Sequence, residues 1–374
     1  MELQCMKQPA LDPGLMICPY CQEEERIGVH SIRERRYRCH ACEGTFSETK
    51  GTIFYGLHYP IWLVTVVMTL LSYGCPPAAA VAAFFLDART VAAWHRKAGR
   101  HGKGVQETQV CQGQIELGQV QADELCVTTQ RGKVWMATAM SVFSRLFLWG
   151  EVSVHRNRPL IERVMQKVRQ AAGSLPQAVL LAVDGFSAYP KAILKIFYPP
   201  QHTGQRGRPR HLPWPDLHIV QMVKTRSGRK LKEITRRLVH GASDRVYEMI
   251  ASSQGDLGWI NTAYIERLNA TFRARMSSLV RRTRSLAQTI QHLEYELFWS
   301  GVVYNFCTVH DTLDGTPAMA AGLTDHVWSI QELLFLKLPQ KPLHGVLSCY
   351  PLPWQSSEIP LRHDCAALTA SSFY

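Results

Sequence analysis

The chain has 374 residues, 46% of them hydrophobic, so it is long enough for a sizeable core and for two or three domains. Its formal net charge of +12 favours polyanionic partners, and nucleic acid before an acidic membrane. Its 11 cysteines are irregularly spaced, which argues against a disulfide framework and for a reducing compartment.

Two C-x2-C pairs follow an N-terminal tail, residues 1–16. The pairs are Cys18–Cys21 and Cys39–Cys42, separated by seventeen residues. This spacing is typical of a structural zinc site, because four thiolates on two tight turns can enclose one ion. A closed site has no open position for catalysis, so one zinc ion is expected to fold a ribbon over residues 17–56.

Residues 57–102 predict three helices. The second begins at Pro76 and Pro77, since proline is tolerated in a first helical turn, and Leu86-Asp87 offers a turn and cap before the third. This pattern indicates a helix-turn-helix DNA-binding domain, and a plain helical bundle joining two domains is the alternative. The expected DNA contacts of the third helix are Arg89, Thr90, Arg96 and Lys97.

Ile61 to Leu86 carries no formal charge, a feature shared with membrane-spanning helices. The sequence Gly74-Cys75-Pro76-Pro77 divides this stretch into two pieces. Each piece is shorter than the roughly 20 residues that a spanning helix needs, so we expect no membrane partner.

A glycine-rich, polar stretch follows, and we expect a linker at residues 103–118. The pattern then predicts three strands, a helix and a fourth, fully apolar strand, at residues 120–127, 135–143, 146–154, 159–172 and 178–183. Asp123 lies on the first strand and Asp184 ends the last. The expected fold is α/β, and open α/β sheets place their sites at the carboxyl ends of strands.

The segment from Ile260 to Arg284 carries one acid, Glu266, ahead of six arginines. Its apolar residues recur every three or four positions and predict one buried helix face: Ile265, Leu268, Phe272, Met276 and Leu279. Glu266, Asn269 and Arg273 line a neighbouring polar stripe. A lone acid beside many cations is the layout expected where a phosphate backbone approaches a metal-binding carboxylate.

Asp123, Asp184 and Glu266 are the candidate catalytic acids. Three convergent carboxylates need countercharge, and two Mg²⁺ ions, or Mn²⁺, would supply it with room for substrate phosphates. Each acid has an alternative role: Asp123 as a surface acid with Glu124 as the ligand, Asp184 as a turn cap, and Glu266 as an ion-pair partner of an arginine. Strand alternation directs Glu124 to the opposite face from Asp123.

A basic stretch at about 200–240 separates Asp184 from Glu266. Its cations Arg206, Arg208 and Arg210 suggest an insertion that contacts DNA, and an ordinary surface loop followed by an amphipathic strand-helix pair is the equal alternative. The long interval leaves Glu248 and Asp256 as fallback third ligands. Beyond the core, residues 311–374 are expected to form a C-terminal helix and an irregular tail.

Together these motifs resemble a DDE transposase with an RNase H-like core, of the insertion sequence one family and its relatives. The resemblance rests on the C-x2-C ribbon, the helix-turn-helix, DEL at Asp123, DG-x3-Y at Asp184 and NTAYIERLNATFR…LVRRT around Glu266. It spans about residues 17–335, with the catalytic domain at 119–310, and implies the triad Asp123, Asp184 and Glu266.

The resemblance implies metal-dependent cleavage at the ends of an insertion element and strand transfer into target DNA. It also implies a prokaryotic protein of the cytoplasm and nucleoid, acting on double-stranded DNA as a homodimer or higher oligomer. The expected phosphate contacts near the site are Asn269, Arg273, Arg281 and Arg282. A DNA-binding regulator with an inactive core and an RNase H-like nuclease without strand transfer are the rival hypotheses.

Overall fold

The computed structural model describes Pro13 and residues 16–338, except 113–114, 174–176, 202–209, 212–213, 229, 256–257 and 281–284. The described residues belong to one compact unit. The tail that the sequence predicts at 341–374 therefore lies outside the described residues.

The N-terminal module is a small antiparallel sheet in the order β1-β2-β3, formed by Ile27–Ser31, Arg36–Cys39 and Thr45–Ser47. Its buried side chains are few: Cys18, Ile27, Tyr37, Cys39 and Phe46. A core this small needs further stabilisation, and the four paired cysteines are compatible with a zinc ribbon.

Three helices follow as the sequence predicts: α1 (Ile61–Ser72), α2 (Pro77–Phe84) and α3 (Ala88–Val105). Phe85 adopts a left-handed conformation, with φ 50°, and ends α2. The side chain of Asp87 then caps α3 by accepting hydrogen bonds from the backbone N–H groups of Arg89 and Thr90.

The expected linker at 103–118 is wrong over its first half. Helix α3 continues to Val105 and passes into a π-helical segment, Gln106–Val110. The glycines here allow close packing: a Cβ at Gly99 would lie 2.4 Å from the Cβ of Tyr295, and one at Gly102 would lie 2.9 Å from the Phe298 oxygen. Both partners lie on α8 (Ile290–Cys307).

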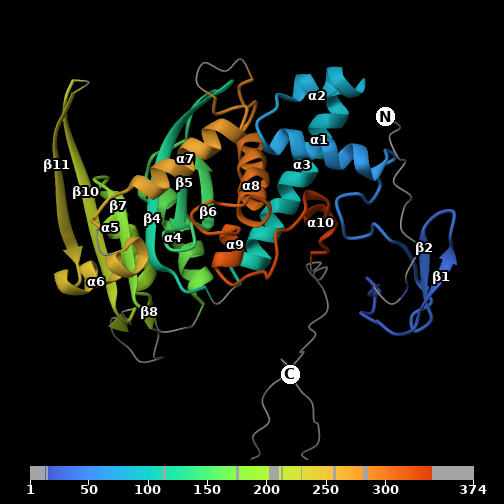
Figure 1. The fold of residues 1–374 in the computed structure, drawn as a ribbon, viewed down its shortest axis with the longest axis horizontal. Coiled ribbons are helices and arrows are strands. Elements are labelled where there is room, and N and C mark those ends of the chain that lie inside the picture. Colours follow the sequence, from blue (N-terminus) through green and yellow to red (C-terminus); the bar gives the residue numbers. More distant parts are fainter. Residues whose placement is uncertain are drawn as a thin grey trace, which may run out of the picture. The chain divides into compact units, whose positions relative to one another are not determined.

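A six-stranded mixed sheet forms the centre of the fold, in the order β11-β10-β7-β4-β5-β6 (Figure 1). Strands β10, β7 and β4 run parallel, and the pairs β4–β5, β5–β6 and β10–β11 are antiparallel. Their bounds are Gly118–Thr129 for β4, Gly132–Ser141 for β5, Phe147–Ser153 for β6, Val179–Asp184 for β7, Leu217–Ser227 for β10 and Lys230–His240 for β11.

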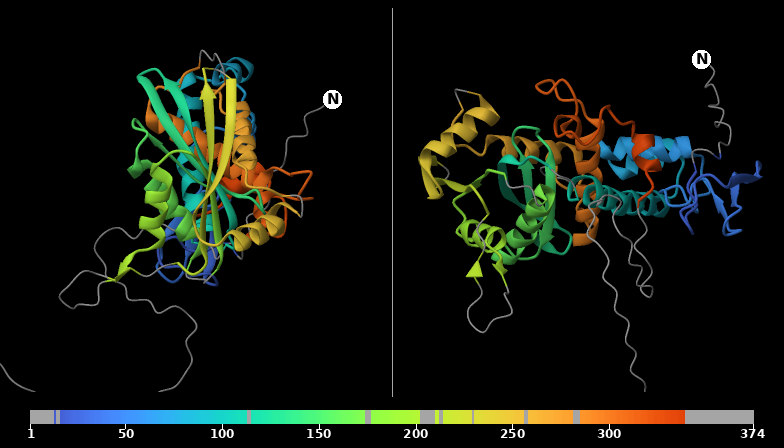
Figure 2. Two further views of the ribbon diagram at one scale, coloured as in Figure 1. Left: turned by 90° about the vertical axis from the view of Figure 1, so that its left-hand side faces the viewer. Right: turned by 90° about the horizontal axis from the view of Figure 1, so that it is seen from below.

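Helices cover both faces of this sheet. Figure 2 (right) shows α4 (Arg158–Ala172) and α5 (Ala188–Phe197) on one side, and α6 (Ser243–Gln254) and α7 (Ala263–Arg275) on the other. Strand β7 is buried on both faces, which explains its continuous apolar sequence. Asn157 caps the start of α4, and Gly173, with φ 64°, ends it.

The predicted insertion at 200–240 differs from expectation, because most of it belongs to the sheet. Leu217, Ile219 and Val220 are buried in β10, which pairs directly with β7. A short pair precedes it, β8 (Pro200–Gln201) with β9 (Arg210–His211), and residues 202–209 lie outside the described part.

The remaining described helices are α9 (Pro317–Ala320) and α10 (Ile330–Phe335), and the latter is the C-terminal helix that the sequence predicts. Helix α8 is buried along most of its length and packs against α3, α7 and β6. No helix in the described part of the chain combines the length and apolarity needed to cross a membrane.

Candidate active site and cysteine cluster

The fold brings Asp123 and Asp184 to neighbouring positions. Strands β4 and β7 are parallel with Ala122 opposite Val183, so the next residue on each strand is an acid. Both acids lie on the sheet face covered by α6 and α7, since Asp123 contacts α7 and Asp184 pairs with Met222. The geometry agrees with the expectation that Asp184 ends its strand beside Asp123, which lies within the first strand of the sheet.

Asp123, Asp184 and Glu266 all line one cavity of about 930 Å³, together with Arg156, Lys224, Asn269 and Arg273. Glu266 stands in the first turn of α7, where its side chain is 49% exposed. It forms an ion pair with Lys224 and accepts a hydrogen bond from the Thr262 hydroxyl at 3.0 Å. Glu266 thus faces the cavity, but an ammonium group and not an arginine holds it.

The closest acidic group is Asp123, Glu124 and Asp184. One carboxylate oxygen from each lies within 4.8 Å of the others, and Glu266 is not part of this group. Glu124 points to the opposite face of β4, as strand alternation predicts, and is buried. There the Tyr189 hydroxyl donates to its Oε2 at 2.8 Å.

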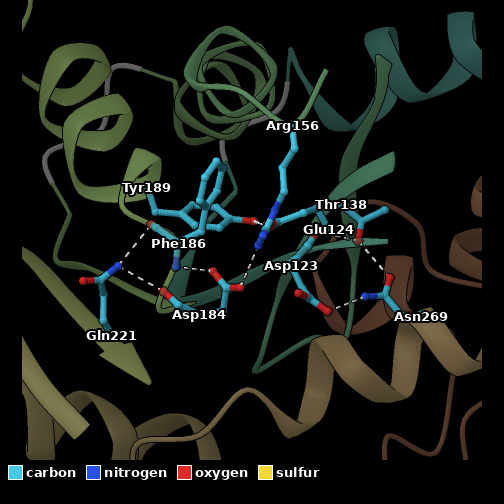
Figure 3. Close-up of polar contacts among 9 residues, drawn as sticks. All are labelled: Asp123, Glu124, Thr138, Arg156, Asp184, Phe186, Tyr189, Gln221 and Asn269. Atoms are coloured by element: carbon cyan, nitrogen blue, oxygen red, sulfur yellow. Dashed lines mark hydrogen bonds and ion pairs between the residues drawn. The ribbon is translucent and has the colours of Figure 1, made fainter. Parts of the chain in front are cut away.

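Arg156 is the residue that sequence reasoning missed. Its guanidinium forms ion pairs with Glu124 and with Asp184, the latter at 3.3 Å, and lies 4.2 Å from the centre of the Phe186 ring (Figure 3). Arg156 follows β6 in a loop, where no motif marks it. Only Tyr189, in the DG-x3-Y pattern, carried a sequence signal for this network.

The Asp184 carboxylate serves two partners. Its Oδ1 accepts a hydrogen bond from the Phe186 backbone N–H at 2.9 Å, so the turn-capping role weighed from the sequence is present. Its Oδ2 faces Arg156. Gln221 also donates to the backbone oxygens of Asp184 and Phe186, at 3.0 and 3.3 Å, which fixes the turn beside the cavity.

Among these acids, Asp123 has the fewest neighbouring groups that could balance its negative charge. Within the described part of the chain it forms no ion pair, and its side-chain partner is the neutral amide of Asn269 at 3.0 Å. Burial, and then the nearby charge of Asp184, raise the pKa of Asp123. A bound divalent cation would relieve both effects, because it favours the ionised carboxylate.

Asn269 does not occupy the position expected of a DNA contact. It is buried on α7, donates to Asp123 and accepts a hydrogen bond from the Thr138 hydroxyl at 2.9 Å. Both ends of its amide are therefore used to hold Asp123 against β5. The sequence placed Asn269 on the correct polar stripe but could not show which neighbour it meets.

Arg273 lines the cavity and makes no ion pair within the described residues, so its charge remains for an anion. On α3, Arg89 and Arg96 are exposed, Thr90 is half-buried, and Lys97 instead donates to the Tyr55 backbone oxygen. Arg210 lies on β9. Four predicted DNA contacts lie outside the described residues: Arg206, Arg208, Arg281 and Arg282.

The fallback acids gain no support from the geometry. Glu248 lies on α6, pairs with Arg245 at 2.6 Å and does not line the acid cavity. Asp256 lies outside the described residues. Of the two third-acid candidates that the structure describes, Glu266 and not Glu248 lines the cavity with Asp123 and Asp184.

The cysteines Cys18, Cys21, Cys39 and Cys42 form one group that could hold a metal ion. The sulfurs of Cys18 and Cys42, and of Cys21 and Cys39, are each 3.6 Å apart. Zinc–sulfur bonds of about 2.3 Å place tetrahedral sulfurs about 3.8 Å apart, so the spacing fits. Although burial opposes it, the backbone N–H groups of Cys42 and Ala41 help lower the pKa of Cys39 to about 7.

The sequence matches no protein-family model, and no curated protein matches it. The resemblance to DDE transposases therefore rests on the chain's own motifs and on the geometry described above.

Proposed function

We propose that this protein is a DDE transposase that binds the ends of its element and catalyses DNA cleavage and strand transfer. The observation that carries the proposal is the cavity in which Asp123 and Asp184, from adjacent parallel strands, face Glu266 on α7. The strand order β6-β5-β4-β7-β10, with three antiparallel and then parallel strands, supports an RNase H-like core.

Magnesium is the metal that the acid site suits best. Its oxygen ligands would come from Asp123 and Asp184, with Glu266 as the longer and more exposed arm that can turn toward them. A pair of such ions, when bound, stabilises the attacking and leaving oxygens of a phosphoryl transfer. Glu124 is bound by Tyr189 and Arg156, so its role is to hold Asp184 in place through the shared guanidinium.

The rest of the chain supplies DNA contacts in this proposal. Arg273 lies beside the acids and would hold a backbone phosphate there. Arg89 and Arg96 are exposed on α3, the third helix of a three-helix unit with the capped turn of a helix-turn-helix. The zinc-binding role proposed for the cysteines is structural, because four thiolates leave no open position.

A strand-transfer assay tests the proposal. Its substrate is the DNA that flanks the coding region, and its target is a supercoiled plasmid in the presence of Mg²⁺. Asp184→Asn should lower joined product by at least about 100-fold, equivalent to about 2.7 kcal/mol, while end binding persists. Glu266→Gln should behave alike, and Glu248→Gln, which removes an acid outside the cavity, should retain activity.

The same assay separates the rival functions. End binding without any metal-dependent nick indicates a regulator with an inactive core. Nicked ends without joined plasmid indicate a nuclease. Full activity of Asp184→Asn would remove Asp184 from the site and with it the proposed chemistry.

A further inference from the structure

A second group of metal-ligating side chains lies where α3 and α8 cross. His95 stands one turn before Gly99. At Gly99 the two helices are so close that no side chain would fit between them. His292 and Glu296 are four residues apart on α8 and share a face. One ligand atom from each of the three residues lies within 4.8 Å of the others.

His95 is buried without a polar partner. Its side chain is 6% exposed, and in the described part of the chain its ring forms no hydrogen bond. It meets the His292 ring edge-on, with 5.9 Å between the centroids. Neither ring nitrogen belongs to the fully enclosed side-chain atoms that lack a hydrogen bond among the described residues, so the ring keeps some solvent access and a lone pair that an ion can take.

Glu296 is a buried carboxylate, 4% exposed, with little countercharge. The hydroxyl of Ser277 donates to its Oε1 at 3.2 Å, and the hydroxyl of Ser278 donates to the other oxygen. Among the described residues its one ion-pair contact is His292 Nε2, at 4.0 Å from Oε1. Burial raises the pKa of Glu296, because the ionised form is poorly solvated there.

We propose that His95, His292 and Glu296 bind a transition-metal ion, with Zn²⁺ the best match. Two imidazoles and one carboxylate are ligands that zinc accepts, with a fourth position left for water. The ion would take the lone pair of His95 and neutralise Glu296. The serine hydroxyls would orient the carboxylate, as outer partners of metal ligands do.

The site needs a small contraction to bind the ion. Zinc bonds of about 2.0–2.2 Å place neighbouring ligand atoms about 3.3–3.6 Å apart. The 4.0 Å contact between His292 and Glu296 must therefore shorten by roughly half an ångström, and the pairs that involve His95, which lie within 4.8 Å, by at most about 1.5 Å. The His292 side chain is 35% exposed, so the described residues do not enclose it on every side.

Such an ion would join three segments. It would fix α3, which carries the proposed DNA contacts, to α8. Through Ser277 and Ser278 it would also hold the turn directly after α7, the helix of Glu266. The site differs from the cysteine cluster in its nitrogen and oxygen ligands and in its open coordination position, so the two can be distinguished spectroscopically.

Zinc content of the full-length protein, measured by mass spectrometry after dialysis and after titration with Zn²⁺, tests this site. The unsubstituted chain should hold two zinc ions. His292→Ala and Glu296→Gln should hold one. His101→Gln is the matched control: His101 is also buried on α3 but is bonded to the Leu333 backbone oxygen at 2.8 Å, so this variant should keep two.

Further arms identify where the ions sit. Asp184→Asn should keep two zinc ions, which excludes the acid cavity as the second site. After cobalt substitution, Cys39→Ser should lose the thiolate charge-transfer absorption, and His292→Ala should retain it. A protein that holds one zinc ion and takes up no second, or a His292→Ala variant that keeps two, overturns the proposal.

Discussion

Replacing Asp123 with asparagine is expected to stabilise the metal-free protein. Its carboxylate lies within 4.8 Å of those of Glu124 and Asp184 and forms no ion pair in the described part of the chain. Two unit charges 4.8 Å apart repel by about 3.5 kcal/mol at an effective dielectric constant of about 20. Arg156 offsets part of this repulsion, which leaves a gain of about 1–2 kcal/mol for Asp123→Asn.

The stabilisation should depend on pH in a defined direction. Burial and Asp184 raise the pKa of Asp123 in the folded protein, so the folded state favours its protonated form. That preference helps folding at low pH and is lost as the pH rises through the raised pKa. An asparagine at this position does not ionise, so Asp123→Asn does not lose this stability. The difference in free energy of unfolding between the variant and the parent should be largest near pH 7 and should shrink as the pH falls toward about 4.

Thermal unfolding with EDTA and with Mg²⁺ measures both effects. A gain of 1–2 kcal/mol corresponds to a rise in Tm of roughly 2–6 °C. Mg²⁺ should raise the Tm of the unsubstituted protein and leave that of Asp123→Asn unchanged. Glu248→Gln is the control, because it removes an exposed carboxylate elsewhere. A variant that is less stable than the parent in EDTA at pH 7 would refute the electrostatic reasoning.

Three further outcomes are expected. Arg273→Gln should weaken end binding and reduce the slope of log K against log salt by about one, as measured by fluorescence anisotropy over a salt series. Arg156→Gln should lower stability by at least about 1 kcal/mol in thermal unfolding, because it leaves buried Glu124 unpaired, with partial rescue by Arg156→Lys. Cys39→Ser, which deletes one of the four proposed zinc ligands, should make residues 17–56 sensitive to protease in limited digestion.

The sequence alone predicted those elements whose residue pattern fits only one position in a fold. The run ending at Asp184 is apolar on both faces, and such a strand belongs in the middle of a parallel sheet. The three-to-four spacing from Ile265 to Met276 gave the buried face of α7, although the helix ends at Arg275, before Leu279. Asp184 and Glu266 could be predicted to face one site, because the end of a strand and the first turn of a helix each fix the direction of a side chain.

Other features depend on partners that lie far along the chain. Nothing local marks Gly99 and Gly102 as packing positions, because their partner α8 lies almost two hundred residues later in the chain. The basic sequence of β11 conceals that its neighbour β10 pairs with β7. Arg156 carries no local motif at all, and its role follows only from the position of Glu124 and Asp184 on two different strands.

The charges around the cavity explain why Asp123 is the centre of the proposed site. Asp184 shares Arg156 with Glu124, and Glu266 has Lys224, so each of these two acids faces a cation within the described residues. Asp123 faces no ion-pair partner within the described residues: its partners are the Asn269 amide, whose oxygen accepts from Thr138, and the Glu124 backbone N–H. A carboxylate fixed in this way keeps its desolvation cost in the metal-free protein. A divalent cation bound at Asp123 would remove that cost, and its affinity would come from repulsion already present in the fold.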